Sequence, residues 1–472
     1  MSPASLRQTT ASVLAAVALI AASLSGAPPS APRDDRPNII VILTDDQSFD
    51  TLPSHPAAMP WLQAQIQDPD GSWLWFPNAF ISTPLCCPSR ATILSGRYSH
   101  HTRVRTNDDG ELFDESDTLA TWLHDAGYFT GLVGKYLNRY PFGRGTYVPP
   151  GWDRWVAKRN TAATTTYYDY GFVDQTIPLQ TAHGAGTYAT DLFADRAVDF
   201  LRISPDERPF FLYFATSAPH PPWTPPPRHS DAFSGVQVPV PASVNERNVS
   251  DKPAWVQALN PLDDDELSRL VSERRLERAT LLGVDDAIRR IVEAVEARGD
   301  LERTVIFFLT DNGFSFGEHR IRGKRCPYEE CIHSPFAVLV PGGKAGQVDG
   351  LISNVDLAPT IADLAGVRPA PLVDGRSFTR ALAGRPWKGP PGVLLEWAGD
   401  SEIPAWQGIR TRDFAYIESA DGTVELYDLT GVKDHADPLE LKNRSQDPRY
   451  REIVVRLAGL LRRLRSREPA RG

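Results

Sequence analysis

The sequence predicts an α/β fold: a large, mostly parallel central sheet flanked by helices, then a smaller C-terminal antiparallel sheet with a helix. Over most of the 472 residues, short apolar runs rich in β-branched and aromatic residues alternate with helical patterns. This alternation is typical of a parallel sheet covered by helices. After residue 385 the pattern changes to short strands of alternating polarity, which predicts the antiparallel sheet.

The central sheet is predicted from five apolar runs. Each run is short and continuous, as in strands that are buried on both faces. In chain order the runs begin at Asn38, Tyr128, Pro209, Thr304 and Pro335.

Helices are predicted between these strands and near the C-terminus. Apolar residues recur on one face over residues 116–127, 190–204 and 263–299. Residues 405–429 predict three short strands with a hairpin turn at Asp421-Gly422, and residues 451–466 predict an amphipathic basic helix. We therefore divide the folded chain into a main domain, residues 37–385, and a C-terminal α+β subdomain, residues 386–472.

The first 27 residues are typical of an export signal, with Arg7 before an apolar run at 13–24 and small residues after it. The run is about 12 residues long, shorter than the roughly 20 that cross a bilayer. An uncleaved anchor remains the alternative reading. No later segment resembles a membrane span, so we expect a leader at 28–36 and a secreted, periplasmic or extracellular protein without a stable membrane span.

Charge and cysteine content limit the function further. The net charge of −9 argues against a general nucleic-acid binder, although a local basic pocket can still take an anionic substrate. Of the four cysteines, Cys326 and Cys331 close a short loop, and the sequence does not decide whether they pair. Cys86 and Cys87 are adjacent, and a disulfide between them would be strained.

Polar side chains follow four of the predicted strands. Ligands of open α/β sheets bind beyond the carboxyl ends of the strands. One set of these residues offers hard oxygen donors that suit Ca²⁺ or Mg²⁺: Asp45, Asp46, Asp311 and Asn312. There is no Cys/His cluster with zinc spacing. Loop capping is the simpler explanation of each residue taken alone.

A second set is basic and suits an anion with tetrahedral oxygens: Arg90, Lys135, His220 and Lys324. Singly, each would be an ordinary surface charge, but together they favour an anion site.

The stretch around Cys86 predicts a helix of about two turns, with Pro88 as its first residue and Gly96 as its stop. Its N-terminus would attract an anion, and Cys86, just before it, would face that anion. A thiolate there would be activated, yet fragile in an oxidising compartment.

These residues resemble a family signature. The run from Cys86 through Pro88 to Arg90, followed by Leu94-Ser95-Gly96, is similar to the signature of the type I, formylglycine-dependent sulfatases of the alkaline phosphatase superfamily. "PNIIVILTDDQ", "GKY", "PHPPW", "TDNGFSFGEH", "KRCPYEE" and "ELYDL" extend the resemblance over nearly the whole chain. "LCCPSRATILSGRYSH" and "GKYLNRY" look like the N-acetylglucosamine-6-sulfatase branch and the extracellular heparan sulfate 6-O-endosulfatases.

The resemblance implies a sulfatase domain at 37–385 and covalent sulfo-enzyme catalysis. A formylglycine-generating maturation enzyme would oxidise Cys86, and the hydrated aldehyde would attack sulfur. One Ca²⁺ per chain would be held by residue 86 with Asp45, Asp46, Asp311 and Asn312.

The basic residues receive roles from the same resemblance. Arg90 would orient the nucleophile, whereas Lys135, His220 and Lys324 would bind sulfate oxygens. His220 or Lys324 would protonate the leaving alcohol. Many family members have a histidine two residues after the strand-end lysine, but here Leu137 and Asn138 follow Tyr136. His100, His101 and His319 are the remaining candidates for the base that releases sulfate.

The implied substrate is a sulfated sugar such as 6-O-sulfated N-acetylglucosamine, or an aryl sulfate. Trp223 is a candidate for stacking on the sugar, although ordinary packing explains it equally well. A phosphate or phosphonate monoester hydrolase on the same scaffold is the nearest alternative, because sulfate and phosphate are similar in size and geometry. A sulfated-glycan-binding protein without turnover is the other.

Overall fold

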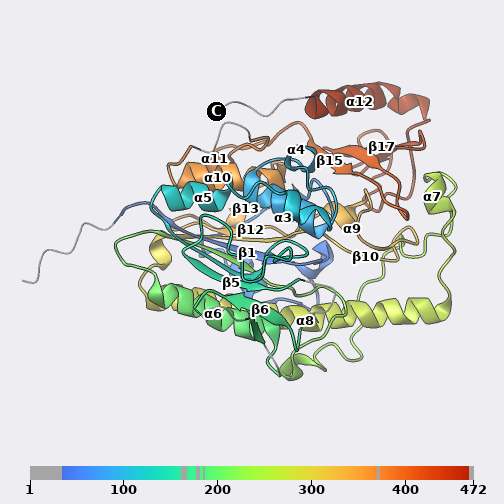
Figure 1. The fold of residues 1–472 in the computed structure, drawn as a ribbon. Helices are drawn as coiled ribbons and strands as arrows, with labels where there is room; N and C mark the ends of the chain where they lie inside the picture. Colours follow the sequence, from blue (N-terminus) through green and yellow to red (C-terminus); the bar gives the residue numbers. More distant parts are fainter. Residues whose placement is uncertain (1–33, 161–166, 177–180, 184–185, 369–372, 467–472) are drawn as a thin grey trace, which may run out of the picture.

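The computed structural model describes residues 34–160, 167–176, 181–183, 186–368 and 373–466. The predicted export signal and most of the predicted leader lie outside the described residues. The described chain forms a central sheet between two layers of helices, and a second sheet carries α12 at its outer side (Figure 1).

The central sheet has ten strands. Their order across the sheet is β13 (Gly346–Gln347), β2 (Trp73–Trp75), β12 (Ala337–Leu339), β9 (Thr304–Thr310), β1 (Asn38–Thr44), β8 (Phe210–Ala215), β4 (Phe129–Lys135), β5 (Arg154–Lys158), β6 (Gly171–Asp174) and β7 (Thr181–His183). The five strands from β9 to β5 are parallel to one another. β12, β6 and β7 pair antiparallel with their neighbours, so the predicted mostly parallel sheet is confirmed.

Burial explains why the central strands are so apolar. All seven residues of β1 are buried, and alternate side chains enter different cores. Ile40 and Ile42 pack on one face of the sheet, whereas Ile39, Val41 and Leu43 pack on the other. A strand that is covered on both faces has no polar side, which is why it reads as one continuous apolar run.

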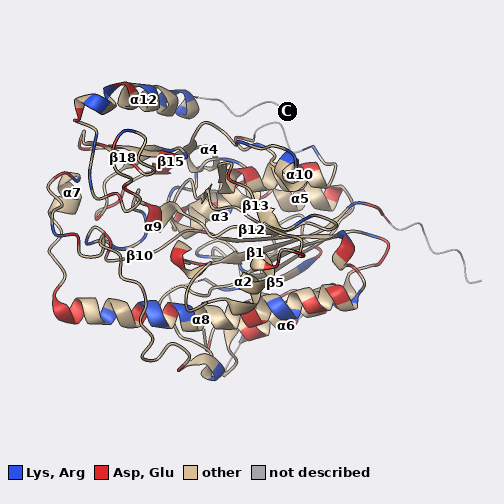
Figure 2. Ribbon diagram, turned by 180° about the vertical axis from the view of Figure 1, so that it is seen from behind, with Lys and Arg blue, Asp and Glu red and all other residues tan. Residues whose placement is uncertain are grey.

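Helices cover both faces of the sheet (Figure 1). One layer contains α2 (Pro60–Gln67), α6 (Ala189–Ile203) and α8 (Asp264–Ala297). The other contains α3 (Cys86–Ser95), α5 (Leu119–Asp125) and α10 (Leu357–Leu364). α8 begins with a capping box, in which the Asp263 carboxylate accepts the Glu266 N–H at 2.8 Å. Its exposed side carries charges of both signs (Figure 2).

The C-terminal sheet contains β15 (Val393–Trp397), β16 (Trp406–Arg410), β17 (Phe414–Ser419) and β18 (Val424–Asp428). α12 (Arg451–Arg465) covers one face, and Leu457 and Leu461 pack against Leu394 and Ile409. The sheet has one strand more than the sequence predicts. We missed β15 because its residues are buried without the polar alternation that marks the other three.

Short elements connect these layers. They are β3 (Ala79–Phe80) with β14 (Ile352–Ser353), β10 (Ser315–Phe316) with β11 (Arg322–Gly323), the helices α4 (Ser99–Thr102), α7 (Ala254–Gln257), α9 (Glu329–Ile332) and α11 (Thr379–Leu382), and the 3₁₀ turns η1 (Phe49–Thr51), η2 (Asp109–Leu112), η3 (Pro227–His229), η4 (Leu301–Arg303), η5 (Asn354–Asp356) and η6 (Pro448–Tyr450).

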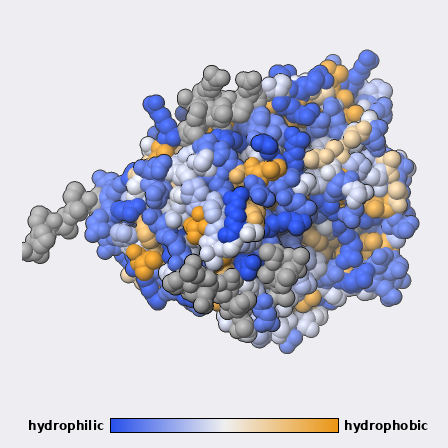
Figure 3. Space-filling view, in the orientation of Figure 1, coloured by the Kyte–Doolittle hydropathy of each residue, from blue (hydrophilic) through white to orange (hydrophobic). Residues whose placement is uncertain are grey.

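Hydrophobic residues on the face shown in Figure 3 form small patches separated by hydrophilic ones. Within the described part of the chain, no helix combines the length and the apolar character that a membrane crossing requires.

Candidate active site

Neighbouring parallel strands bring the predicted polar residues to one edge of the sheet. Leu43 on β1 is level with Ala215 on β8, Thr44 with Thr310 on β9, and Gly134 on β4 with Ala215. The strands therefore end at the same height. The residues that follow, or in one case end, these strands are Asp45, Asp46, Lys135, His220, Asp311 and Asn312.

α3 places Cys86 beside these strand ends. The helix begins at Cys86 rather than at Pro88, and its N-cap is Leu85. Pro88 is tolerated as the third residue because the first four N–H groups of a helix have no helical acceptor. Gly96 ends the helix with φ +68°, and its N–H donates to Thr92 O at 2.8 Å.

The Cys86 thiol lies among carboxylates and an ammonium group. It is fully buried, and its Sγ lies 3.5 Å from Asp45 Oδ1 and 3.7 Å from Asp46 Oδ1. Lys324 Nζ lies 2.9 Å from the same Sγ. Burial raises the pKa of the thiol, and the positive charges of Lys135 and Lys324 oppose this only in part.

Each of the three aspartates has a basic partner. Lys135 Nζ donates to Asp45 Oδ2 at 2.5 Å, and Lys324 Nζ donates to both oxygens of Asp46 at 2.6 and 2.8 Å. Arg90 Nε donates to Asp311 Oδ2 at 2.7 Å, and Arg90 Nη1 donates to the Lys135 carbonyl at 2.8 Å. Positive and negative side chains therefore alternate through a buried site.

His220 faces the same cluster. Its Nδ1 lies 2.6 Å from the Pro221 carbonyl, and its Nε2 lies 3.5 Å from Asp46 Oδ2. Because a carbonyl can only accept, Nδ1 carries a proton and Nε2 is the nitrogen turned towards the site. Burial lowers the pKa of His220, and Asp46 and Asp45 oppose the shift.

The pKa values of two of the carboxyl groups shift in opposite directions. Burial would raise the pKa of Asp45, but Lys135 and the other basic groups hold it well below its usual value. For Asp311, burial and the nearby charge of Asp45 raise the pKa to about 6, despite Arg90.

The donor set fits a hard divalent cation. Asn312 Nδ2 donates to Asp46 Oδ1 at 2.7 Å and to Gly313 O at 2.9 Å. Its Oδ1 is buried and has no hydrogen-bond partner among the described residues, which leaves an amide oxygen beside the carboxylates. Carboxylate and amide oxygens are ligands that Ca²⁺ accepts.

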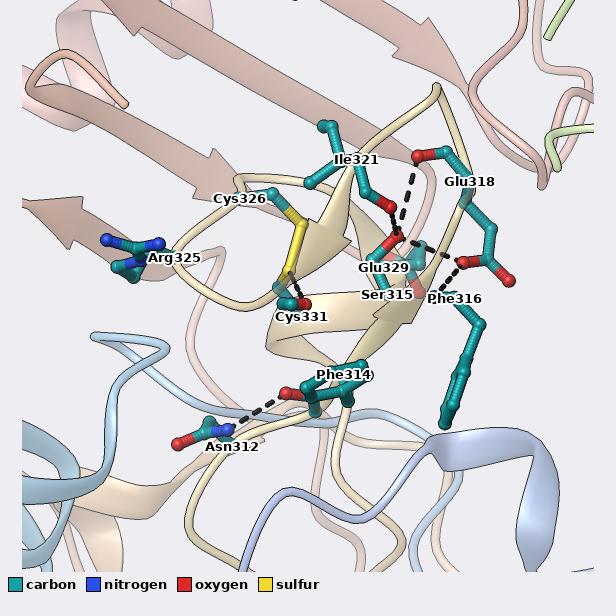
Figure 4. The surroundings of a disulfide bond; sticks show 12 residues. Asn312, Phe314, Ser315, Phe316, Glu318, Ile321, Arg325, Cys326, Glu329 and Cys331 are labelled. Carbon is teal, nitrogen blue, oxygen red and sulfur yellow. Dashed lines mark hydrogen bonds between the residues drawn. A yellow bond between two sulfur atoms is a disulfide. The ribbon is translucent and has the colours of Figure 1, made fainter. Parts of the chain in front are cut away.

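The loop from Asn312 to Lys324 is anchored on α9 (Figure 4). Gly313 N–H donates to Cys331 O at 2.9 Å, and a Cβ on Gly313 would lie 2.1 Å from the Glu330 carbonyl oxygen. Cys326 and Cys331 form a disulfide just beyond Lys324. Only glycine at 313 lets the loop approach α9 this closely.

The structure thus joins all nine predicted site residues through direct contacts. It does not bring the three candidate bases into contact with these nine residues. His100 contacts Glu396, His101 contacts Asp374 and His319 contacts Glu246. Within the described residues, none of these histidines hydrogen-bonds to the cluster around Cys86.

One basic residue was missed. Lys158 ends β5, level with Lys135 on β4, and burial together with Lys135 lowers its pKa to about 8. The same strand-end argument would have found it if "RWVAK" had been recognised as a strand.

A hollow of about 530 Å³ lies against residues next to the site. Pro221, Pro222 and Trp223, which follow His220, line one side, and Arg322 and Gly323, which precede Lys324, line another. Trp223 is 9% exposed and packs edge-on against Phe314, with ring centroids 5.3 Å apart.

An anion bound at this site would contact the residues that can hold a cation, the Cys86 position and several basic side chains at the same time. This fold and site define a hydrolase that cleaves esters of tetrahedral oxyanions. The sulfatase family model matches residues 37–367, and the model for the C-terminal region of N-sulphoglucosamine sulphohydrolase matches residues 317–467. The chain belongs to the sulfatase family of the alkaline phosphatase superfamily, and its enzyme class is that of the sulfuric ester hydrolases.

Relatives agree with this assignment. The chain is 33% identical to human N-acetylglucosamine-6-sulfatase over 389 residues, covering 77% of this chain and 68% of the relative. It is 34% identical over 371 residues to the extracellular sulfatase SULF-1 homolog of Drosophila melanogaster, covering 75% of this chain but only 32% of that protein. The structure of BT4656 in complex with its substrate D-glucosamine-2-N,6-O-disulfate superimposes with a TM-score of 0.76 at 25% identity, covering 91% of this chain and 97% of the other.

Proposed function

We propose that this chain hydrolyses sulfate monoesters of sugars, with 6-O-sulfated N-acetylglucosamine as the substrate class. The observation that carries the proposal is the position of Cys86, at the start of α3 between two aspartates and the Lys324 ammonium group. The substrate class rests on similarity to N-acetylglucosamine-6-sulfatases and to a structure that holds a 6-O-sulfated glucosamine.

Cys86 is the first residue of α3. We propose that a maturation enzyme converts Cys86 to formylglycine, which supplies a hydrated aldehyde able to attack sulfur. Arg90, one turn further along α3, is fixed by Asp311 and by the Lys135 carbonyl, so it holds its neighbours in place. Because the helix and both partners are buried, little reorganisation precedes the reaction.

Asp45, Asp46, Asp311 and Asn312, with residue 86, would hold Ca²⁺, which acts as a Lewis acid towards a sulfate oxygen. Lys135 and Lys324 provide ammonium groups to bind the remaining sulfate oxygens. The proton for the leaving alcohol would come from Nζ of Lys324, or from Nε2 of His220 when the imidazole carries a proton on both nitrogens; these are the two nitrogens turned towards the Asp46 side of the site.

The sugar would occupy the hollow beside Trp223. The residues next to His220 and Lys324 line the hollow. When these two side chains hold the sulfate, the attached sugar ring would lie in the hollow. Arg322, which pairs with Glu273 at 2.8 Å, adds a polar wall.

We also propose that the protein acts outside the cytoplasm, and that residues 37–385 and 386–472 form its catalytic domain and C-terminal subdomain.

Sulfate release from a panel of 6-O-, 2-O- and N-sulfated saccharides tests the substrate class. The panel includes an aryl sulfate, an aryl phosphate and a phosphonate monoester, all at equal concentration. We expect kcat/KM for the 6-O-sulfated sugar to exceed the value for each phosphorus ester by at least about 100-fold. Faster turnover of a phosphorus ester would contradict the proposal, and so would mass spectra showing only unmodified thiol at residue 86 in protein from its native source.

A further inference from the structure

A second cluster of metal-ligating side chains lies behind the active-site loop, and we call His319, Glu330 and Glu440 the rear cluster. One imidazole nitrogen and one carboxylate oxygen from each glutamate lie within 4.8 Å of one another. His319 comes from the β10–β11 hairpin, Glu330 from α9 and Glu440 from the segment after β18. His319 is 0% exposed and Glu440 1%, whereas Glu330 is partly exposed, so two of the three side chains are buried.

His319 is oriented as metal-binding histidines usually are. Its Nδ1 lies 2.6 Å from Glu246 Oε2, and a carboxylate fixes the tautomer by accepting the Nδ1 proton. This leaves a lone pair on Nε2. That nitrogen is buried and has no hydrogen-bond partner in the described part of the chain.

The surrounding charges are not balanced. Three neighbouring carboxylates have basic partners: Glu246 with Lys252 at 3.5 Å, Glu318 with Arg274 at 2.7 Å, and Glu329 with Arg410 at 2.5 Å. Glu330 and Glu440 have no ion pair within the described residues, and Glu330 Oε2 and Glu440 Oε1 lack hydrogen-bond partners there. Glu440 Oε2 accepts the Glu329 N–H at 2.9 Å.

Such an arrangement is costly without a ligand. The carboxylates of Glu330 and Glu440 lie within 4.8 Å of each other, and like charges this close repel. Three buried polar atoms without partners in one place also oppose folding, because each has lost its water without gaining a bond.

We propose that the rear cluster binds a divalent cation, Zn²⁺ or Mn²⁺, at a structural site distinct from the active site. One imidazole nitrogen and two carboxylate oxygens form a ligand set that favours these ions, whereas Ca²⁺ prefers oxygen ligands throughout. Two positive charges balance Glu330 and Glu440. The proposal depends on none of the catalytic roles assigned above.

The cation would join three segments that are far apart in the sequence. The β10–β11 hairpin leads directly to Lys324, α9 supports Gly313, and Glu440 belongs to the C-terminal region. Fixing these segments to one ion positions the loop that carries Lys324 next to Asp46 and Cys86.

Metal content of the full-length protein tests the proposal. The protein is stripped with a chelator, dialysed against excess Ca²⁺ and micromolar Zn²⁺, and analysed by inductively coupled plasma mass spectrometry. We expect about one Zn²⁺ per chain in the wild type and at least a 10-fold weaker affinity in Glu440→Gln. Glu425→Gln is the matched control, because Glu425 is a buried glutamate outside the cluster, and it should retain the zinc.

X-ray absorption at the zinc edge identifies the zinc ligands in the wild type. It needs no variant, so it still tests the proposal if Glu440→Gln does not fold. We expect one imidazole nitrogen and carboxylate oxygens at about 2.0–2.2 Å. Asp45→Asn should keep this zinc while losing Ca²⁺. Absence of bound Zn²⁺ and Mn²⁺ in the wild type, equal zinc in Glu440→Gln, or loss of zinc in Asp45→Asn would overturn the proposal.

Discussion

The active-site cluster and the rear cluster use similar buried carboxylates in opposite charge surroundings. In the active site Asp45, Asp46 and Asp311 face Lys135, Lys324 and Arg90, so three negative side chains meet three positive ones. In the rear cluster neither glutamate forms an ion pair within the described residues, because the nearby Arg274 and Arg410 pair with other carboxylates. A divalent ion would therefore make the first site positive and the second neutral. Under the two proposals above, this difference separates a site for an anionic ester from a site that only joins chain segments.

The largest expected effect comes from removing the nucleophile position. Cys86→Ala should reduce sulfate release by at least about 10³-fold, because no other group in the described site offers an attacking atom there. Kinetics with a 6-O-sulfated sugar and a thermal unfolding curve measure this. Cys87→Ala is the matched control: it removes a buried thiol next door and should keep activity within about 10-fold. Equal losses in the two variants would show that packing, not chemistry, causes the effect.

A smaller effect should follow a change in the charge balance of the active site. Asp311→Asn removes one carboxylate and leaves Arg90 without its 2.7 Å partner, so Ca²⁺ content and kcat/KM should fall together. We expect a loss of about 10² to 10³ in kcat/KM. Metal analysis and steady-state kinetics of the same preparation check this. Undiminished calcium would show that Asp311 is not a ligand.

The smallest effect concerns a buried carboxylate that needs no cation. Burial raises the pKa of Glu425 to about 7, although Tyr427 and Tyr328 donate hydrogen bonds to it. The folded state therefore holds a proton that the unfolded chain releases near pH 4.5, and the free energy of unfolding falls as pH rises through this range. Between pH 5 and 8 the wild type should lose up to about 3 kcal/mol more than Glu425→Gln.

Denaturant unfolding at several pH values measures that difference. A pH dependence equal in both proteins would show that Glu425 is ionised in the fold. A buried carboxylate would then have to be stabilised in the fold in some way other than by a basic partner or a metal ion.

The sequence predicted which polar residues lie together more completely than it predicted the fold around them. Strands such as β1 and β9 are buried on both faces, so their apolar composition alone predicts them. The residue that follows each of these strands belongs to the site. β5 and β6 are short and carry charged residues, so they were not recognised in the sequence as strands and Lys158 was not found. In the C-terminal sheet the sequence predicts three strands instead of four. β15 was not recognised because it is buried throughout.

The rear cluster has no signature in the sequence. Glu440 lies more than 100 residues from His319 and Glu330, and none of the three follows a predicted strand. Only the packing of the C-terminal region on α9 brings them together. The Cys326–Cys331 disulfide likewise depended on backbone geometry, because the two Cα atoms must come within bonding range, here 5.6 Å.

Gly313 has a consequence for the whole molecule. It follows Asn312 directly, and a Cβ on it would lie 2.1 Å from the carbonyl oxygen of Glu330. Any side chain at position 313 would therefore push the segment that carries Asn312 away from α9 and away from Asp46, to which Asn312 donates a hydrogen bond. In a saturation library this position should reject even alanine.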